Sequence, residues 1–335
     1  MEISIERQLR FEFASLESAS FRPMRFVRSL CSVVLILVAT GLFCPSRAHC
    51  QAKAWIVTDA TTGFVLDSSN PAKKLPVGSL TKIATAMVVL DWADAEHRDL
   101  NEMAVVPNSA AGLNAVQGVG FTPGDQVTLR DLLYAAMMQS DNQAAETLAI
   151  HVGTALGGGN PGEKFVAQMN ALARRLGMTN TRFLNPHGLD GLERSDPYST
   201  AEDLSKLTTY AMDSSAFRFY VSQKERKIAI QTALGEQNQY LLRNTNEVLG
   251  VNAIDGVKTG TTRKAGQCVI ISAARPPESR QEGEQHIITP RRLNVVVLGA
   301  SDRFGLAVSL LQRGWQRYDQ WAAAGRPAKG WKPSR

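Results

Sequence analysis

The sequence has few of the residues whose abundance marks particular classes of protein. Four cysteines in 335 residues exclude a disulfide scaffold, and five histidines give little basis for a histidine-rich metal site. Lysine and arginine number 37 against 31 aspartates and glutamates and form no block, so the net charge of +6 does not predict nucleic-acid binding. Hydrophobic residues make up 44% of the chain, which is enough for a sizeable core in one large domain or two modest ones.

Residues 22–50 have the features of a secretory signal peptide. Three arginines precede an uncharged apolar run from Leu30 to Phe43, and small residues follow where cleavage is expected, near residues 48–52. The run is shorter than the ~20 residues that span a bilayer, so no stable membrane anchor is expected after cleavage. We therefore predict that residues 1–50 are a signal peptide with a preceding extension, and that the protein is exported to the bacterial periplasm or cell-wall space. Translation starts at the first methionine or at Met24.

Export changes the cysteine content of the mature chain. Cys31 and Cys44 leave with the signal, and Cys50 leaves too if the cut follows it, so Cys268 is then nearly alone. A single cysteine in an oxidising compartment is more often a small buried apolar residue than a nucleophile. We expect Cys268 to be buried.

The remainder of the chain predicts an α+β fold. Two β-prone runs, 54–58 and 64–66, flank a glycine-containing turn and predict a hairpin. Helices are expected at 80–92, 128–138, 142–151, 163–176 (with Gly177 as the C-terminal cap), 199–212 and 303–321. Further strands are expected at 227–232, 239–242, 267–273 and 293–299, and residues 276–290 are expected to form a long polar hairpin loop between the last two. Strands from both ends of the chain should pair in one antiparallel sheet with the helices inserted between them, and no second domain is expected.

Three short segments carry chemically useful side chains: Ser79-Leu80-Thr81-Lys82, Ser140-Asp141-Asn142 and Lys258-Thr259-Gly260. Taken singly, each has an ordinary structural interpretation, namely a helix cap, a turn and a solvated strand edge. Taken together, they suggest nucleophilic catalysis.

Ser79 and Lys82 are three residues apart, so on a helix they share a face. A serine hydroxyl becomes a good nucleophile when a base takes its proton, and a neutral lysine can do so. Burial or a nearby cation must lower the lysine pKa, and Lys258 is a candidate for that cation. The free N–H groups at a helix start, including that of Ser79, favour developing negative charge.

The three segments, in this order, resemble the superfamily of penicillin-binding proteins and active-site serine β-lactamases, and most closely its low-molecular-mass D-alanyl-D-alanine carboxypeptidases. Other stretches share this resemblance: 55–66, 121–125, 183–190 with 198–204, and 244–246 with 255–266. The resemblance implies a β-lactamase/transpeptidase-like α+β fold, with an antiparallel sheet packed with helices and a mostly helical subdomain inserted. It assigns residues 52–322 to a D,D-peptidase domain and leaves 323–335 as a short polar tail, without a C-terminal β-domain or amphipathic anchor.

The resemblance implies a serine D,D-carboxypeptidase that removes the terminal D-alanine from peptidoglycan stem pentapeptides. Ser79 would form the acyl-enzyme, Lys82 would accept its proton, and Ser140 would relay a proton to the leaving amine. Water would then hydrolyse the acyl-enzyme, with no metal or other cofactor. β-Lactam antibiotics are expected as covalent inhibitors.

The resemblance also implies the binding residues. Asn142 would hold the catalytic lysine and the substrate amide. Lys258, Thr259 and Thr261 would bind the terminal carboxylate, and the backbone N–H groups of Ser79 and Thr261 would form the oxyanion hole. Some members of the family have histidine where this chain has Thr261, a difference expected to affect rate and pH optimum.

Three other functions stay open. The same residues could serve a D,D-endopeptidase that cleaves peptidoglycan cross-links. Asp141 occurs at the equivalent place in class A β-lactamases, but their deacylating glutamate has no convincing counterpart, since Glu193 is a poor candidate. A non-catalytic wall-binding module is disfavoured because all the reactive residues are present. His187 and Asp190 are interpreted as structural residues of a turn.

Overall fold

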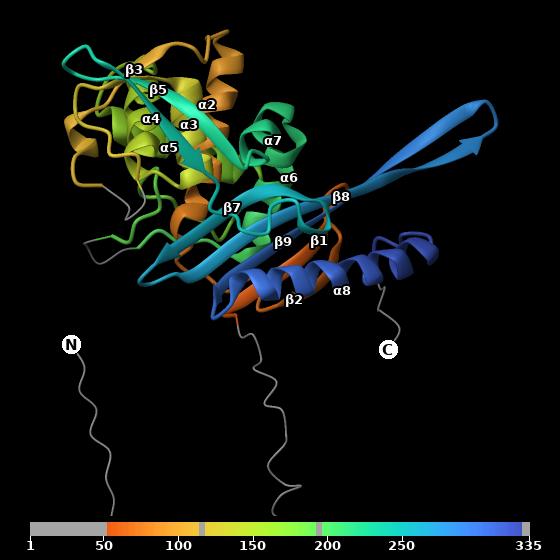
Figure 1. Ribbon diagram of the computed structural model, residues 1–335. Helices are drawn as coiled ribbons and strands as arrows, with labels where there is room; N and C mark the ends of the chain where they lie inside the picture. Colours follow the sequence, from red (N-terminus) through yellow and green to blue (C-terminus); the bar gives the residue numbers. More distant parts are fainter. Residues whose placement is uncertain (1–51, 114–117, 192–195, 330–335) are drawn as a thin grey trace, which may run out of the picture. The chain divides into compact units, whose positions relative to one another are not determined.

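The β-prone runs at the two ends of the chain come together in one five-stranded antiparallel sheet. In the computed structural model, which describes residues 52–113, 118–191 and 196–329, the strand order is β2-β1-β9-β8-β7 (Figure 1). The strands are β1 (Ala54–Asp59), β2 (Val65–Ser69), β7 (Ile254–Thr262), β8 (Gly266–Glu282) and β9 (Gln285–Ala300). The predicted hairpin and the predicted pairing of distant strands are confirmed.

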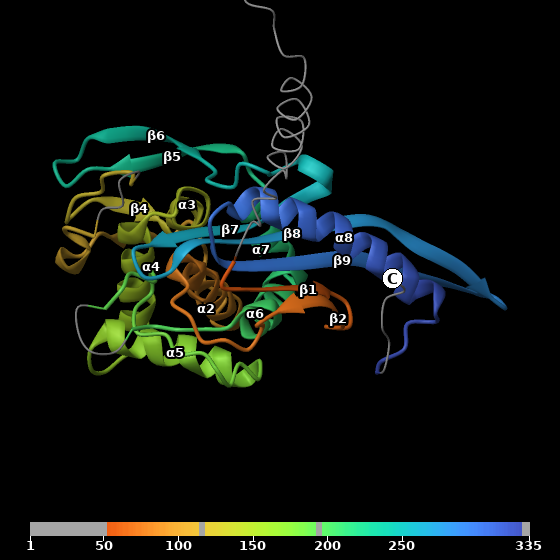
Figure 2. The same cartoon turned by 90° about the horizontal axis from the view of Figure 1, so that it is seen from below.

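The central strands of this sheet bury both faces. One set of alternate residues packs against α8 (Arg303–Ala323) and includes Val57, Val269, Ile271, Val295 and Val297. The other set belongs to the core shared with the remaining helices and includes Ile56, Ile270, Val296 and Leu298. Figure 2 shows α8 on one face of the sheet and α2 and α6 on the other. Successive side chains of a strand point to opposite faces, so the unbroken apolar runs reflect cover on both sides.

The helices of the middle region follow the predicted order. They are α2 (Lys82–Ala95), α3 (Leu129–Tyr134), α4 (Asn142–Ala155), α5 (Pro161–Arg175), α6 (Ala201–Asp213) and α7 (Ser215–Val221), with short turns η1 (Gly78–Thr81), η2 (Asn108–Ala110), η3 (Ala135–Gln139) and η4 (Val251–Ala253). The predicted glycine after α5 is confirmed, since Gly177 has a φ of 66°. No prediction covered α7, whose seven residues are too short to show a helical period. No helix in the described ranges has the length and apolar character needed to cross a membrane.

The expectation of a single sheet is wrong. A second, four-stranded sheet has the order β3-β4-β5-β6, from β3 (Met103–Val105), β4 (Gln126–Thr128), β5 (Glu225–Gln231) and β6 (Gln237–Arg243). The expected strands at 227–232 and 239–242 lie here, where only one face is covered: Ile228, Ile230 and Leu242 are buried and most of their neighbours are exposed. Alternation along a strand indicates a half-buried sheet, but it does not say which sheet the strand joins.

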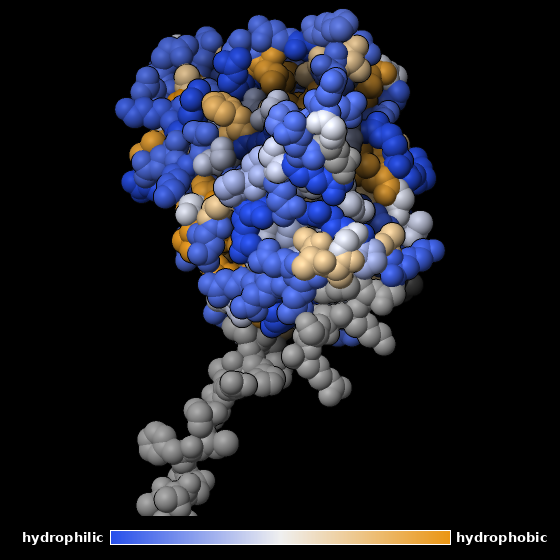
Figure 3. All heavy atoms as spheres, turned by 90° about the vertical axis from the view of Figure 1, so that its right-hand side faces the viewer, coloured by the Kyte–Doolittle hydropathy of each residue, from blue (hydrophilic) through white to orange (hydrophobic). Residues whose placement is uncertain are grey.

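The expected hairpin between the last two strands is confirmed, but residues 276–290 form a two-stranded ribbon rather than a long loop. Strands β8 and β9 stay paired from Glu278–Thr289 to Glu282–Gln285, after a register shift beyond Arg275. The ribbon projects past the rest of the sheet in Figure 1, and the side of the molecule toward which it points is largely hydrophilic in Figure 3. Because both faces of the ribbon are solvated, its strands lack the apolar alternation that predicts a strand.

Candidate active site

Ser79 lies in the 3₁₀ turn η1, one turn before α2 begins at Lys82. Ser79 occupies neither N-cap position, since Val77 is the N-cap of η1 and Thr81 that of α2, so the interpretation of Ser79 as a helix cap is wrong. The Ser79 Oγ instead accepts a hydrogen bond of 3.0 Å from the Lys82 Nζ. A 3₁₀ turn is tighter than an α-helical turn, and it brings the Ser79 hydroxyl into direct contact with the Lys82 amine three residues later.

Lys82 is fully buried, and its Nζ has three acceptors. These are the Ser79 Oγ at 3.0 Å, the Asn142 Oδ1 at 2.7 Å and the His187 carbonyl at 2.9 Å. Burial lowers the pKa of Lys82 to about 7, while the negative charge of Asp141 acts in the opposite direction. A substantial fraction of Lys82 is therefore neutral near pH 7, as a general base requires.

The segment Ser140-Asp141-Asn142 stands where the helical middle region breaks, as predicted. The π-helical turn η3 ends at Ser140, whose φ of 66° is left-handed, and α4 then begins at Asn142. Asp141 is buried and accepts from the backbone N–H groups of Ala144 and Val119, each at 2.7 Å. These bonds fix the break, so that Asn142 reaches Lys82 while Ser140 lines the cleft beside Ser79.

Strand β7 forms the opposite wall and contacts the serine turn through a glycine. A Cβ added to Gly260 would lie 2.9 Å from the Val77 carbonyl and 3.2 Å from the Ser79 nitrogen. Only glycine permits this approach. The next residue, Thr261, also lines the cleft, and its nitrogen would lie 3.4 Å from a Cβ added to Gly78 in the serine turn. The resemblance assigns the oxyanion hole to the N–H groups of Ser79 and Thr261, which this turn and strand bring close together.

Lys258 is also buried on β7, but it is much less well partnered. In the described ranges its Nζ has one acceptor, the Thr259 carbonyl, at 3.0 Å. Burial lowers its pKa well below the usual value, and the charges of Lys82 and Arg303 lower it further. For Lys82 itself, burial rather than Lys258 is the main cause of the lowered pKa.

Two further residues of the cleft escaped the sequence analysis. The Arg303 Nη1 donates to the Thr261 Oγ1 at 2.8 Å, and the Thr245 and Thr259 hydroxyls are 2.6 Å apart. Arg303 is the first residue of α8, and no local pattern in the sequence marks it as part of the cleft. Thr245 lies within the stretch 244–246 that shares the family resemblance, and this resemblance is the sequence signal that could have identified it as a residue of the cleft.

The turn after α5 presses against the serine turn from a third side. A Cβ on Gly188, whose φ is +80°, would lie 2.0 Å from the Gly78 carbonyl. His187 is buried, and its Nδ1 accepts a hydrogen bond from the Leu189 N–H. Burial and the charge of Lys82 lower the pKa of His187 to about 3, so its ring is uncharged. Asp190 accepts from the Thr262 hydroxyl at 2.7 Å. The structural interpretation of His187 and Asp190 is confirmed, and Glu193 lies outside the described residues.

These three walls enclose a cleft of about 920 Å³. It is lined by Ser79, Gln139, Ser140, Asn142, Leu189, Tyr240, Leu241, Arg243, Asn244, Thr245, Glu247, Thr259, Gly260, Thr261 and Arg303. In the part of the chain that the structure describes, no three histidine, cysteine or acidic side chains are grouped as metal ligands. Cys268 is buried as expected, and burial raises its pKa to about 11, so its thiol is a poor nucleophile.

The sequence matches known proteins over most of its length. Residues 42–282 match the family model described as D-alanyl-D-alanine carboxypeptidase. The chain is 33% identical over 277 residues to the carboxypeptidase DacC of Escherichia coli, a match covering 80% of this chain and 62% of that protein. It is 33% identical over 300 residues to a D-alanyl-D-alanine endopeptidase of Pseudomonas aeruginosa, covering 87% of this chain and 85% of that protein. The chain thus spans less than two thirds of the first relative and most of the second.

Solved structures show the same fold. A mutant of the Streptomyces K15 DD-transpeptidase superposes with a TM-score of 0.67 at 28% identity, covering 79% of this chain and 98% of that one. Penicillin-binding protein D2 of Listeria monocytogenes, solved with ampicillin bound, gives a TM-score of 0.61 at 27% identity, covering 79% and 97%. The predicted β-lactamase/transpeptidase-like α+β fold is confirmed.

Proposed function

Because this chain belongs to the D-alanyl-D-alanine carboxypeptidase family, we propose that it is a serine D,D-carboxypeptidase that removes the terminal D-alanine from peptidoglycan stem pentapeptides. One observation carries the proposal. The Ser79 hydroxyl lies 3.0 Å from a fully buried lysine amine whose pKa is lowered to about 7. A nucleophile in contact with a base that is partly neutral at pH 7 is what acyl transfer to serine requires.

Acylation follows from the geometry. Lys82 takes the Ser79 proton as the Oγ attacks the carbonyl of the penultimate D-alanine, and the N–H groups of Ser79 and Thr261 receive the oxyanion. The C–N bond then breaks, and the departing amine takes a proton through Ser140, leaving an ester on Ser79. Water hydrolyses the ester in a second step that regenerates the serine hydroxyl.

The substrate carboxylate explains the under-partnered lysine. The carboxylate of the terminal D-alanine would be bound by Lys258 and by the hydroxyls of Thr259 and Thr261. Arg303 would orient the Thr261 hydroxyl through the hydrogen bond that it donates to it. A carboxylate placed there favours the charged form of Lys258 and opposes the effect of burial on its pKa. Binding energy from this contact positions the scissile bond over Ser79.

Mass spectrometry of the intact protein after incubation with a penicillin, beside the Ser79→Ala variant, tests the mechanism. We expect a persistent adduct of one equivalent, absent from the variant. Release of D-alanine from a stem pentapeptide tests the substrate. Destruction of the penicillin without an adduct would indicate a β-lactamase, and an intact penicillin without an adduct would favour a wall-binding module.

The endopeptidase is the second candidate function. A relative named D-alanyl-D-alanine endopeptidase is 33% identical and matched over 85% of its own length. The same acyl-enzyme serves either substrate, and only the leaving group differs.

We also propose that the protein acts outside the cytoplasmic membrane, where peptidoglycan lies. The support is the signal-like sequence of residues 22–50, which falls outside the described residues. Fractionation of cells followed by N-terminal sequencing would locate the mature protein, and we expect its first residue near residues 48–52.

A further inference from the structure

The four-stranded sheet opens between two of its strands. Strand β5 pairs with β6 along its whole length, but it pairs with β4 only at Gln126 and Gln231. Farther from this pair, Asp131 of α3 takes the place of a neighbouring strand, and its carboxylate accepts from the Ala229 N–H at 3.1 Å. The opening contains a pocket of about 280 Å³, and no residue lines both this pocket and the catalytic cleft.

Positive charge predominates in this pocket. Arg130 and Asp131 line it from α3, and Arg226 and Lys227 line it from β5. Three cations against one carboxylate leave an excess of two positive charges in a small volume. Within the described ranges, none of the three cationic side chains makes a hydrogen bond or an ion pair. The pocket therefore holds charge that the fold itself does not use for pairing.

Arg226 shows most clearly that a partner is missing. Its guanidinium lies over the ring of Tyr134, 4.8 Å from the ring centroid, and this contact fixes the group in the pocket wall. Its Nε is buried and has no hydrogen-bond partner. Buried donors without an acceptor are rare in folded proteins, because they lose water and gain nothing in exchange. An oxyanion in the pocket would give this guanidinium the acceptor that it lacks.

The nearby carboxylates do not neutralise the two arginines. Asp131 accepts from the backbone of β5 and forms an ion pair with neither guanidinium. Burial raises the pKa of Asp131, and the charges of Arg226 and Arg130 offset only part of this shift. Asp99, whose carboxylate also feels the charge of Arg130, accepts instead from the backbone and side-chain amides of Asn101. Both guanidinium groups thus remain available to a ligand.

The size and charge of the pocket favour one class of ligand. The donors of a guanidinium match the paired oxygens of carboxylates and phosphates. A carboxylate carries a single negative charge, whereas a phosphate monoester carries about 1.5 to 2 at pH 7, which matches the excess of positive charge. The volume lies at the lower end of the range for ligand sites, so it suits a single group of this kind and not a whole sugar or peptide.

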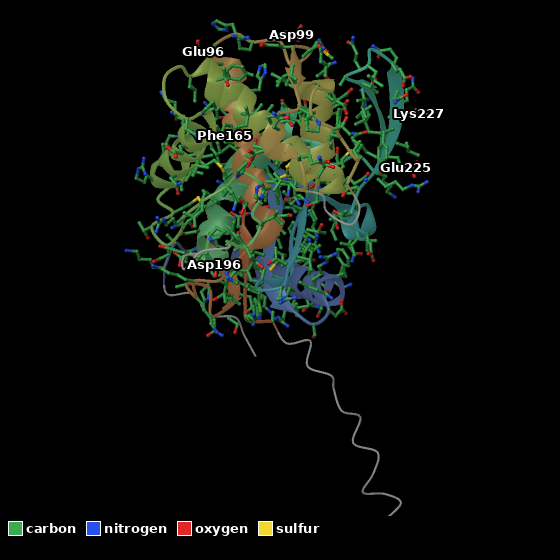
Figure 4. All side chains as sticks on the ribbon, turned by 90° about the vertical axis from the view of Figure 1, so that its left-hand side faces the viewer. Glu96, Asp99, Phe165, Asp196, Glu225 and Lys227 are labelled. Carbon is green, nitrogen blue, oxygen red and sulfur yellow. The ribbon has the colours of Figure 1, made fainter. Side chains whose placement is uncertain are left out.

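We infer that Arg130, Arg226 and Lys227 form a binding site for a phosphoryl dianion, which is either free phosphate or the phosphate monoester of a larger molecule. The inference goes beyond the proposed function, because none of these residues takes part in acyl transfer. Figure 4 shows Lys227 on β5 at the periphery of the molecule, and its side chain is exposed. A larger molecule bound through its phosphate can therefore extend from the pocket into solvent.

Isothermal titration calorimetry with inorganic phosphate, in a phosphate-free buffer of low ionic strength, tests the site. We expect one phosphate to bind per chain. Arg130→Gln and Arg226→Gln should each raise Kd about tenfold, in proportion to one hydrogen bond between charged groups. Asp131→Asn should lower Kd, because it removes a negative charge beside the anion and keeps an oxygen for the Ala229 N–H. Arg174→Gln, at an exposed position of α5, is the matched control and should keep the wild-type Kd.

Three further ligands distinguish the sources of the anion. If glycerol 3-phosphate binds as tightly as inorganic phosphate, the site takes a phosphate monoester. If inorganic phosphate binds and glycerol 3-phosphate does not, the ligand is the free ion. Dimethyl phosphate, a diester with one negative charge, should bind more weakly than either. Acetate that binds as tightly as phosphate would overturn the assignment to a phosphoryl group.

Three results would overturn the site itself: no binding of phosphate to the wild type, a Kd within twofold of wild type in both arginine variants, or weaker binding by Asp131→Asn. Acylation by penicillin checks that each variant is folded. If Arg226→Gln fails this check through loss of the Tyr134 contact, Arg130→Gln decides. A wild-type protein that binds phosphate but is not acylated by penicillin would overturn the proposed function and leave this site standing.

Discussion

Two buried lysines lie on opposite walls of the cleft, and their surroundings differ. Lys82, on the helical wall, donates to three acceptors, whereas Lys258, on the sheet wall, donates only to the carbonyl of the next residue among those described. Burial lowers the pKa of both. Three acceptors fix the amine of Lys82 beside the nucleophile, while Lys258 keeps donors for an anion supplied from outside.

The comparison separates catalysis from recognition within one cleft. The helical wall is complete before substrate arrives: serine, base and the asparagine that orients the base already contact one another. The sheet wall is completed by the substrate carboxylate. Substitutions on the helical wall should therefore slow acylation by any acylating agent. Substitutions on the sheet wall should slow the reaction mainly of substrates that carry the terminal carboxylate.

Lys82→Ala should have the largest effect. Without the base, the Ser79 hydroxyl keeps its proton, and we expect the rate constant of acylation by a penicillin to fall by ~10²–10⁴-fold. Stopped-flow or mass-spectrometric acylation kinetics would measure it. Lys73→Ala, an exposed lysine near the same turn, serves as the control. Acylation within threefold of wild type would remove Lys82 from the role of base.

Lys258→Gln should have the next largest effect, and it should depend on the substrate. We expect kcat/KM for a D-alanyl-D-alanine peptide to fall about 10²-fold, since the variant loses a charged partner of a desolvated carboxylate. For the same peptide with a C-terminal amide, both enzymes should be slow and nearly equal. If the variant lost kcat/KM equally on the peptide acid and on the peptide amide, Lys258 would not act by binding the carboxylate, and the proposed difference between the two walls would be wrong.

Arg303→Leu should act through Thr261, whose hydroxyl it holds at 2.8 Å. We expect a decrease of about tenfold in kcat/KM, mainly through KM, because one hydrogen bond from a charged group is lost. Steady-state kinetics on the pentapeptide would measure it. A decrease in kcat alone would contradict this role, because it would show that Arg303 contributes to the chemical step, as the residues of the helical wall do, and not to substrate binding.

Asp141→Asn should give the smallest effect, a shift in pH dependence. Acylation needs neutral Lys82, so its rate rises with pH through the lysine pKa of about 7. The negative charge of Asp141 favours the ammonium form, so its removal lowers that pKa and moves the rise to lower pH. The pH profile of penicillin acylation would show it. A shift to higher pH, or none, would contradict this electrostatic role.

The sequence predicts the helical wall better than the sheet wall. Ser79 and Lys82 are three residues apart, so local geometry alone brings them together, and the break at Ser140 is visible as a polar interruption. Arg303 reaches Thr261 across 42 residues of chain, and only tertiary folding determines such a contact. For the same reason the sequence could not say that β5 and β6 form a separate sheet.

The tip of the ribbon formed by β8 and β9 is a suitable place to insert a tag. It is fastened near its base by Glu278, which pairs with Arg291 and with Arg326 beyond α8, so its geometry does not depend on its tip. Turns at such tips tolerate insertions. A fluorescent or affinity tag built into Gly283–Glu284 would project from the enzyme and leave both walls of the cleft untouched, so the protein could be imaged or immobilised while it works on an insoluble polymer.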